Sequence, residues 1–475
     1  MKIAFAASEA APFLKTGGLG DVAQALPAAL SALPDCEVAL ILPYHGAIKH
    51  NPAYKTEFIT SFAVNLAWRQ CHVGLFRLKS RKKRLQVYFV DNEQYFDRTR
   101  IYGENDDGER YAFFSKAALA CLAAVSFRPD VVHCNDWQTA LIPLLLKSEY
   151  AGTFPETKSV FTIHNVEYQG WVDDCFNMDV LGLPAEYSDV LRFGDAANFM
   201  KAAIVMADAV TTVSESYAEE LRYPYYSHGM DSVLRQYGYK LSGITNGIDE
   251  ASCDPRGKNV PSPYTSATAE DGKRACKKAL QKEIGLAEDE GTALLAMVTR
   301  LASHKGIDLL TYIADRLMER RVQLVVLGTG EQQYEDFLQT LQVRYPGRVA
   351  SLLQFNSALA DHIYAGADVY LMPSKSEPCG LSQLIAMRFG AVPVVNAVGG
   401  LKDTVTPYEG ETGRGFTFQS YNGDDFLAAI DRALAVYYDT PEAWKTLRKR
   451  DMELDLSWKA PARRYLELYR NLTGK

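Results

Sequence analysis

The stretch VYLMPSKSEPCGLS, residues 369–382, decides the fold class. Its first four residues, Val369–Met372, are apolar, and a short apolar run is typical of a strand that is buried on both faces of a parallel sheet. A proline, a carboxylate, a glycine and several hydroxyls follow, and the next residues begin a helix. The stretch therefore predicts a strand, a turn and a helix, which together form the repeating unit of α/β proteins.

Similar apolar runs recur on both sides of this stretch. In the first third of the chain they alternate with helical patterns, at 21–30 and 110–124 for example, and a second series begins after residue 290. The predicted strands cover residues 3–7, 38–42, 87–90, 131–133 and 160–163 in the first series and 293–298, 322–327, 349–353, 369–372 and 392–395 in the second. This repetition predicts two doubly wound, Rossmann-like α/β domains.

The predicted domains are separated by a segment, residues 249–271, that is rich in Asp, Pro, Ser, Asn and Gly and lacks strand or helix periodicity. We expect an N-terminal domain over 1–245 and a C-terminal domain over 246–456. A last helix is predicted after the final strand of the second sheet. We therefore expect residues 457–475 to pack on the first domain. Open α/β sheets bind ligands beyond the carboxyl ends of their strands, which predicts a site in the cleft between the domains.

Composition argues against several kinds of partner. The net charge of −7 offers no general attraction for nucleic acid or an anionic membrane, and the basic run 81–84 is expected to be a solvated turn. The longest apolar stretch, 117–127, is too short for a bilayer, which needs about 20 residues, and the N-terminus lacks a signal-peptide core. Eight cysteines without CxxC or metal-ligand spacing favour free thiols in the cytoplasm and predict no metal site.

Two loops have residue types that suit a diphosphate group. KTGGLGD at 15–21 follows the first predicted strand and opens a helix, where glycines let backbone amides approach an anion. A tight turn with a solvated lysine explains this loop equally well. Arg300 and Lys305 follow the strand at 293–298, where two cations would neutralise a leaving diphosphate without a metal. Two solvated surface cations are the alternative.

The third and strongest signal is the loop of residues 373–382. Glu377 supplies a carboxylate close to the end of a strand, and the backbone amides of Gly380, Leu381 and Ser382 are available to an anion at the start of a helix. Gly399 and Gly400, after another predicted strand, allow a further close approach of the backbone. Together with Arg300 and Lys305, these residues predict a site for an anionic ligand.

These motifs resemble those of the bacterial glycogen synthase and plant starch synthase family. The matching stretches are KTGGL at 15–19, RLASHKG at 300–306, SKSEPCGLS at 374–382 and GGLKDTV at 399–405, with further matches at 136–137, 164–165 and 246–249. The resemblance runs nearly end to end. It implies the GT-B fold and retaining transfer of glucose from ADP-glucose to the non-reducing 4-hydroxyl of an α-1,4-glucan, either glycogen or a maltooligosaccharide. It implies no metal or other cofactor.

The resemblance also implies a role for each matching residue. The catalytic residues would be Glu377, His164, Lys305, Arg300 and Asp136. The donor-binding residues would be Lys15, Gly17, Gly18, Asn246, Phe355, Cys379, Gly380, Leu381 and Ser382. Among these, Lys15 and the two glycines after it would contact the donor phosphates or the glucosyl unit, and Phe355 would stack on the adenine.

The chain departs from the family pattern at several positions. Gln138 stands where the family commonly has His, Phe355 where it usually has Tyr, and Ser376 and Ser382 where it usually has Phe and Thr. An aromatic ring keeps its stacking face without the hydroxyl. Two alternatives therefore stay open: a UDP-glucose-dependent retaining glycosyltransferase with another acceptor, and an inactive glucan-binding paralogue.

Overall fold

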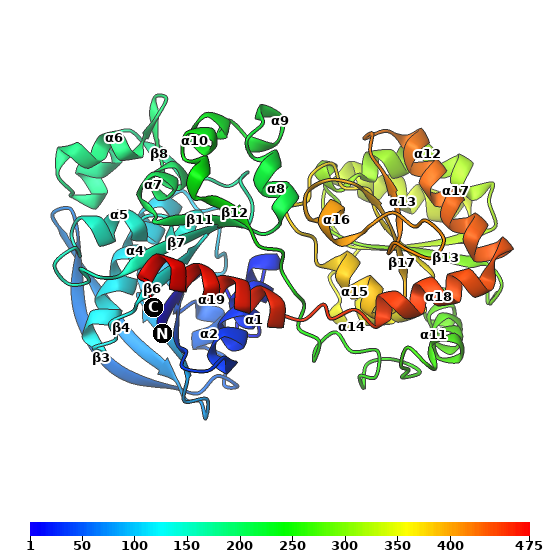
Figure 1. Cartoon of the computed structure of the whole chain (residues 1–475), viewed down its shortest axis with the longest axis horizontal. Helices are drawn as coiled ribbons and strands as arrows, with labels where there is room; N and C mark the ends of the chain where they lie inside the picture. The colour runs from blue at the N-terminus through cyan, green and yellow to red at the C-terminus, as the bar shows by residue number, and fades with distance from the viewer. The chain divides into compact units, whose positions relative to one another are not determined.

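The computed structural model describes all 475 residues and divides the chain into two compact units. Unit 1 comprises Met1–Asn246 and Trp458–Lys475, and unit 2 comprises Gly247–Ser457. The end of the chain thus belongs with the N-terminal residues, and unit 2 is an insertion between two pieces of unit 1. Each unit is built around its own largely parallel sheet with helices packed against it (Figure 1).

The main sheet of unit 1 has nine strands in the order β12-β11-β7-β6-β1-β2-β5-β4-β3. These strands are β1 (Lys2–Ala6), β2 (Glu37–Pro43), β3 (Thr56–Leu66), β4 (Arg69–Leu78), β5 (Leu85–Asp91), β6 (Val131–Asn135), β7 (Lys158–Ile163), β11 (Ala209–Thr212) and β12 (Leu241–Gly243). The pairs from β12 to β5 are parallel, whereas β3 and β4 form an antiparallel hairpin at one edge. The hairpin was not predicted, because its apolar residues alternate with polar ones.

Helices cover both faces of this sheet. One face packs against α4 (Asp107–Ala124), α5 (Ile142–Lys147) and α7 (Phe199–Met206), and the other against α1 (Gly18–Ala32) and α19 (Lys459–Thr473). The other helices of unit 1 are α2 (Gly46–Lys49), α3 (Glu93–Phe96), α6 (Ser188–Leu191), α8 (Glu215–Glu220), α9 (Pro224–Ser227) and α10 (Asp231–Gln236), and a small sheet is formed by β8 (Trp171–Asp173), β9 (Arg192–Phe193) and β10 (Ala196–Asn198).

The last helix, α19, is part of the core of unit 1. Tyr465, Leu466 and Tyr469 are buried together with apolar residues of α1 and β1. The hydroxyl of Tyr469 is also hydrogen-bonded to Nδ1 of the buried His133, at 2.6 Å, on β6. Residues near the two ends of the chain therefore complete one core.

The sheet of unit 2 has six parallel strands in the order β15-β14-β13-β16-β17-β18. They are β13 (Ala293–Val298), β14 (Val322–Leu327), β15 (Val349–Leu352), β16 (Val369–Met372), β17 (Val392–Asn396) and β18 (Phe416–Phe418). The helices are α11 (Ala269–Ile284), α12 (Ile307–Met318), α13 (Gln332–Arg344), α14 (Ser357–Gly366), α15 (Ser382–Arg388), α16 (Gly399–Thr404), α17 (Gly423–Asp439) and α18 (Pro441–Met452). The predicted linker at 249–271 is irregular only as far as Thr268, because α11 begins at Ala269.

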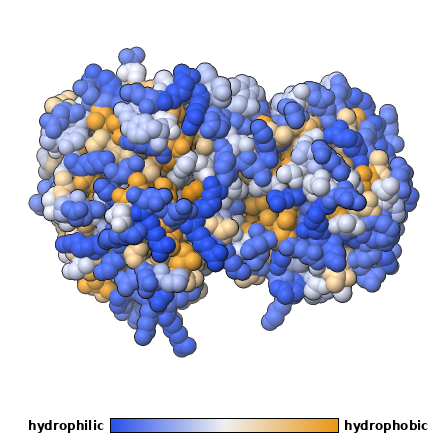
Figure 2. Space-filling model, viewed as in Figure 1, coloured by the Kyte–Doolittle hydropathy of each residue, from blue (hydrophilic) through white to orange (hydrophobic).

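On the face drawn in Figure 2, hydrophilic residues surround smaller apolar areas. No helix combines the length and the apolar character that crossing a bilayer requires. The basic run 81–84 is exposed in the turn before β5, as predicted.

One buried carboxylate in unit 2 is expected to lower stability. Neither oxygen of Asp451, on α18, has a hydrogen-bond partner, and burial raises the pKa of this side chain well above its ordinary value. A folded-state pKa above the unfolded one makes folding less favourable as pH rises, because the unfolded carboxylate ionises first. We expect Asp451→Asn to stabilise unit 2 at pH 7 by on the order of 1 kcal/mol. Urea unfolding at pH 5 and pH 8 tests this, and a variant less stable at both pH values would contradict it.

Candidate active site

In unit 1, three of the predicted residues follow strands that are neighbours in the sheet. The strand order reverses beside β1, since the chain continues through β2 on one side and through β6 and β7 on the other. Such a reversal opens a crevice at the carboxyl ends of the strands, where ligands of open α/β sheets bind. Lys15 lies in the loop after β1, Asp136 directly follows β6, and His164 directly follows β7. The topology thus brings these three residues to one edge of the sheet.

Asp136 has a strained backbone and an unusual carboxyl group. Its φ of 54° and ψ of −179° lie in a region that is occupied almost only by glycine, and strain of this kind is concentrated at functional sites. The carboxylate accepts hydrogen bonds from the backbone amides of His164, at 2.7 Å, and Asn165, at 3.4 Å. Desolvation raises the pKa of Asp136 to about 7, although these two bonds lower it. The group therefore titrates near neutral pH, as a proton-exchanging residue requires.

His164 is neutral and presents one ring nitrogen as an acceptor. Its Nε2 is 3.0 Å from Oδ1 of Asn135, whose own Nδ2 donates to the carbonyl of Ala6 at 2.9 Å. This arrangement assigns the ring proton to Nε2 and leaves Nδ1 without a partner in the protein. Burial lowers the pKa of His164 to about 3, so the ring stays uncharged at neutral pH. Nδ1 is thus able to accept a hydrogen bond from a hydroxyl group.

The loop of residues 15–18 is exposed at the start of α1. The ammonium group of Lys15 forms an ion pair with Asp21 at 2.7 Å, within the first turn of the helix. The backbone amides of Gly18 and Leu19 make no hydrogen bond within the chain, as is usual at a helix N-terminus. A charged side chain and free amide donors are therefore available to an anion at this loop.

In unit 2, the strand order reverses between β13 and β16, and the other catalytic candidates follow these two strands. The ammonium group of Lys305 lies 2.7 Å from a carboxylate oxygen of Glu377, which also accepts a hydrogen bond from the hydroxyl of Ser374 at 3.0 Å. Glu377 is 7% exposed. Arg300, by contrast, is exposed, and its guanidinium group has no partner in the protein. The site thus contains one cation that is paired with the carboxylate and one that is free.

Two glycines let the loops of this site pack closely. Gly306 has φ of 77°, and a Cβ atom there would lie 2.1 Å from the carbonyl oxygen of Pro373. A Cβ atom on Gly400 would lie 2.3 Å from the backbone of Cys379, while the amide of Gly400 donates to the carbonyl of Glu377 at 3.0 Å. No side chain fits at either place. These contacts join the loops that follow β13, β16 and β17.

The turn before α15 is held by a residue that the sequence motifs did not reveal. Nε2 of the buried Gln383 donates to the carbonyl of Cys379 at 3.1 Å, to that of Gly380 at 2.9 Å, and to the hydroxyl of Thr404 at 3.0 Å. The backbone amides of Gly380, Leu381 and Ser382 then remain without a partner in the chain. These free amides are suited to a phosphate or a sugar hydroxyl.

Two further predicted donor-binding residues differ in their surroundings. Asn246 is buried at the end of the first segment of unit 1, and its side-chain oxygen has no hydrogen-bond partner. Phe355, in the loop after β15, is 89% exposed. A phenyl ring so open to water has a free face on which a flat ligand is able to stack. That Asn246 binds the donor and that Phe355 stacks on its adenine stay predictions.

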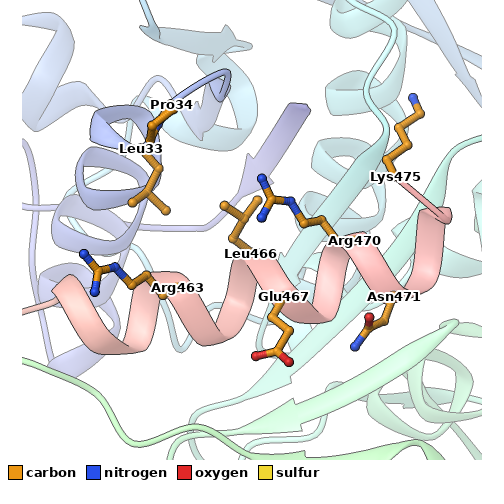
Figure 3. A pocket seen from close by; sticks show the side chains of 8 residues that line it. All are labelled: Leu33, Pro34, Arg463, Leu466, Glu467, Arg470, Asn471 and Lys475. Carbon is orange, nitrogen blue, oxygen red and sulfur yellow. The ribbon is translucent and has the colours of Figure 1, made fainter.

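One surface cavity lies away from these residues. It has a volume of about 690 Å³ and is formed by the end of α1 and by α19 (Figure 3). Its lining residues are Leu33, Pro34, Arg463, Leu466, Glu467, Arg470, Asn471 and Lys475. None of the predicted site residues is among them. No group of three or more His, Cys, Asp or Glu side chains in the chain is arranged to hold a metal ion.

Comparison with known proteins identifies the family. Residues 2–236 match the starch synthase catalytic domain, and residues 280–449 match the group 1 glycosyl transferases. The chain is 44% identical to the glycogen synthase of Clostridium beijerinckii over the full length of both, and 45% identical to that of Lachnospira eligens over 98% of each. The chain belongs to the glycogen and starch synthase family. It is therefore a glycosyltransferase with the GT-B fold, as its motifs predicted.

Solved structures agree with membership of this family. The catalytic domain of starch synthase IV from Arabidopsis thaliana, bound to ADP and acarbose, matches with a TM-score of 0.91 and 31% identity, over 100% of this chain and 99% of that one. Sucrose-phosphate synthase from Thermosynechococcus elongatus matches with a TM-score of 0.63 and 19% identity, over 100% of this chain and 99% of that one. The second match shows a shared fold alone.

Proposed function

We propose that the protein transfers glucose from ADP-glucose to the non-reducing 4-hydroxyl of an α-1,4-glucan and retains the α configuration. The observation that carries this proposal is the group formed by Arg300, Lys305 and Glu377 beyond β13 and β16. Relatives that are glycogen synthases support the glucan acceptor, and the ADP bound to the Arabidopsis enzyme supports an adenine nucleotide. We also infer that the reaction takes place in the cytoplasm, where the eight free cysteines would stay reduced.

The proposed chemistry assigns the leaving group to the two cations. As the bond from C1 of glucose to the diphosphate breaks, negative charge grows on the phosphate oxygen, and Arg300 and Lys305 stabilise it. The acceptor oxygen forms the new bond to C1 on the same face of the sugar, and its proton passes to the departing diphosphate. Glu377 orients Lys305, while Asp136 and His164 are assigned to the glucosyl unit and the acceptor. No metal is needed if two cations carry the charge.

The direct test is transfer of labelled glucose to glycogen from ADP-glucose and UDP-glucose, side by side and with EDTA present. We expect incorporation from ADP-glucose, insensitivity to EDTA and release of the incorporated label by an amylase that is specific for α-1,4 bonds. A marked preference for UDP-glucose would overturn the donor assignment. Loss of activity in EDTA would overturn the metal-free mechanism. Absence of transfer from both donors, with glycogen still bound, would instead indicate the inactive paralogue.

Phe355→Ala tests the assignment of the adenine site. Stacking of a base on an aromatic ring contributes about 1–3 kcal/mol, so we expect KM for ADP-glucose to rise by about tenfold or more with little change in kcat. Tyr312→Ala removes another exposed ring of unit 2, on α12, and is the matched control. An unchanged KM in Phe355→Ala, or an equal change in both variants, would contradict stacking on Phe355.

A further inference from the structure

A buried carboxylate lies behind the glycine-rich loop that follows β1. Glu9 is only 3% exposed, and no lysine or arginine pairs with it. One oxygen accepts hydrogen bonds from the backbone amide of Thr16 at 2.8 Å and from the hydroxyl of Thr16 at 2.6 Å. The other oxygen accepts from the backbone amide of Gly20 at 3.1 Å. The carboxylate therefore bridges the two ends of the segment 16–20.

This carboxylate occupies the place where an external anion would bind at the start of α1. The first turn of a helix favours negative charge because its backbone amides have no partner within the helix. Glu9 already takes the amide of Gly20, in the first turn of α1, and that of Thr16, just before the helix. A phosphate bound there would have to displace a buried charged group. The donors that remain for a ligand are the amides of Gly18 and Leu19 and the side chain of Lys15.

The hydrogen bonds also explain why Glu9 stays in place. Burial raises the pKa of Glu9, whereas the hydrogen bonds from Thr16 and Gly20 lower it. The ionised carboxylate is therefore stabilised mainly by hydrogen bonds that the loop donates. In return, the charge-assisted bonds restrict the loop, which is otherwise exposed from Lys15 to Gly18. The carboxylate and the loop therefore order each other.

We propose that Glu9 is a positioning residue for the sugar-nucleotide donor: by holding Thr16 and Gly20, it orders the loop that presents Lys15 and the Gly18 amide to the donor. Glu9 itself would not touch the substrate. The inference rests on the proposed function, in which the loop of residues 15–18 binds the donor. It differs from the simple view of α1 as a phosphate-binding helix, because the protein's own carboxylate fills part of that position.

Three variants test the inference through steady-state kinetics. Glu9→Gln keeps the shape but replaces one accepting oxygen by an amide group, which has no lone pair for Thr16 or Gly20. We expect kcat/KM for ADP-glucose to fall at least tenfold while KM for glycogen stays within twofold of the wild type. Thr16→Val removes only the hydroxyl bond and is expected to lower kcat/KM for ADP-glucose about threefold. Thr16→Ser retains the hydroxyl and is expected to resemble the wild type.

Hydrogen–deuterium exchange of the same full-length proteins gives an independent readout. Glu9→Gln should speed exchange in peptides covering residues 10–21 and leave the rest of unit 1 unchanged. If Glu9 only stabilises the fold, exchange will rise throughout unit 1, and the melting temperature will fall with KM values unchanged; this result would overturn the inference. A kcat/KM for ADP-glucose within twofold of the wild type in Glu9→Gln would also overturn it.

These outcomes remain separate from a failure of the proposed function. If the wild type prefers UDP-glucose, the donor assignment fails, and the same kinetic comparison with UDP-glucose decides the role of Glu9. If calorimetry shows that the wild type binds neither ADP-glucose nor UDP-glucose, both the proposed function and the role of Glu9 are overturned. Normal transfer by the wild type with an unaffected Glu9→Gln variant would reject the inference alone.

Discussion

Lys305→Ala is expected to lower kcat for glucosyl transfer by about two to three orders of magnitude, comparable to the loss of one oxyanion-stabilising donor. The ammonium group would no longer stabilise the departing diphosphate, and Glu377, 2.7 Å away and largely buried, would lose its only cationic partner. Both effects act on the same pair of residues. Initial rates of labelled glucose incorporation at saturating ADP-glucose and glycogen measure the change.

Two more variants separate these effects. Arg300→Ala removes a cation that has no protein partner, so its loss of kcat reports on the leaving group without disturbing Glu377. Adding Glu377→Gln to Lys305→Ala should change kcat little further if the two residues act as one unit. Arg316→Ala, which removes a half-buried cation paired with Asp424, is the control and should keep wild-type activity. A kcat for Lys305→Ala within tenfold of the wild type would refute the assignment.

Acidification is expected to destabilise unit 1 strongly, with His133 as a main cause. Burial lowers the pKa of His133 to about 3, whereas the unfolded chain has the ordinary value of 6.5. The folded state therefore binds fewer protons, and stability is full above about pH 6.5 and is lost as pH falls towards 3. At pH 4 the loss from this residue amounts to about 3 kcal/mol. His164 and His45, with pKa values lowered to about 3 and about 4, act in the same direction.

His133→Gln isolates this contribution. The variant is expected to lower stability at pH 7, because bonds to Tyr469 and Thr162 are disturbed, but to lose less stability than the wild type between pH 7 and pH 4. Guanidinium unfolding at both pH values gives this difference directly. His72→Gln makes the same chemical change at an exposed position on β4 and should leave the difference unaltered. An equal pH dependence in the wild type and His133→Gln would contradict the argument.

The parallel strands were predictable from sequence because they are buried on both faces. The apolar runs predicted at 293–298, 322–327 and 369–372 coincide with β13, β14 and β16. The hairpin of β3 and β4 was missed because its polar and apolar residues alternate, as is typical of a strand with one solvent-exposed face. The strand β18 was missed because three residues carry too little pattern to distinguish a strand from a loop.

The candidate site residues were named from the sequence, but the contacts between them were not. Lys305 and Glu377 were each singled out by their place after a strand, yet only the sheet order brings residues so far apart in sequence into one ion pair. Glu9 was not singled out, because a single glutamate after a strand is indistinguishable from a solvated one until its burial is known. The strained backbone of Asp136 likewise has no signature in the residue type. These features arise from tertiary packing, which local patterns do not encode.

The insertion of unit 2 between the two pieces of unit 1 sets an order of events during synthesis. Unit 2 is complete once Ser457 has left the ribosome, whereas the core of unit 1 waits for Tyr465, Leu466 and Tyr469, which are made later. Domains generally fold as they emerge, N-terminal first. Here the unit begun first is finished last, and until α19 docks, the nascent chain leaves an apolar face beside α1 uncovered. During that interval this apolar face lies open to water, which favours its association with other exposed apolar surfaces.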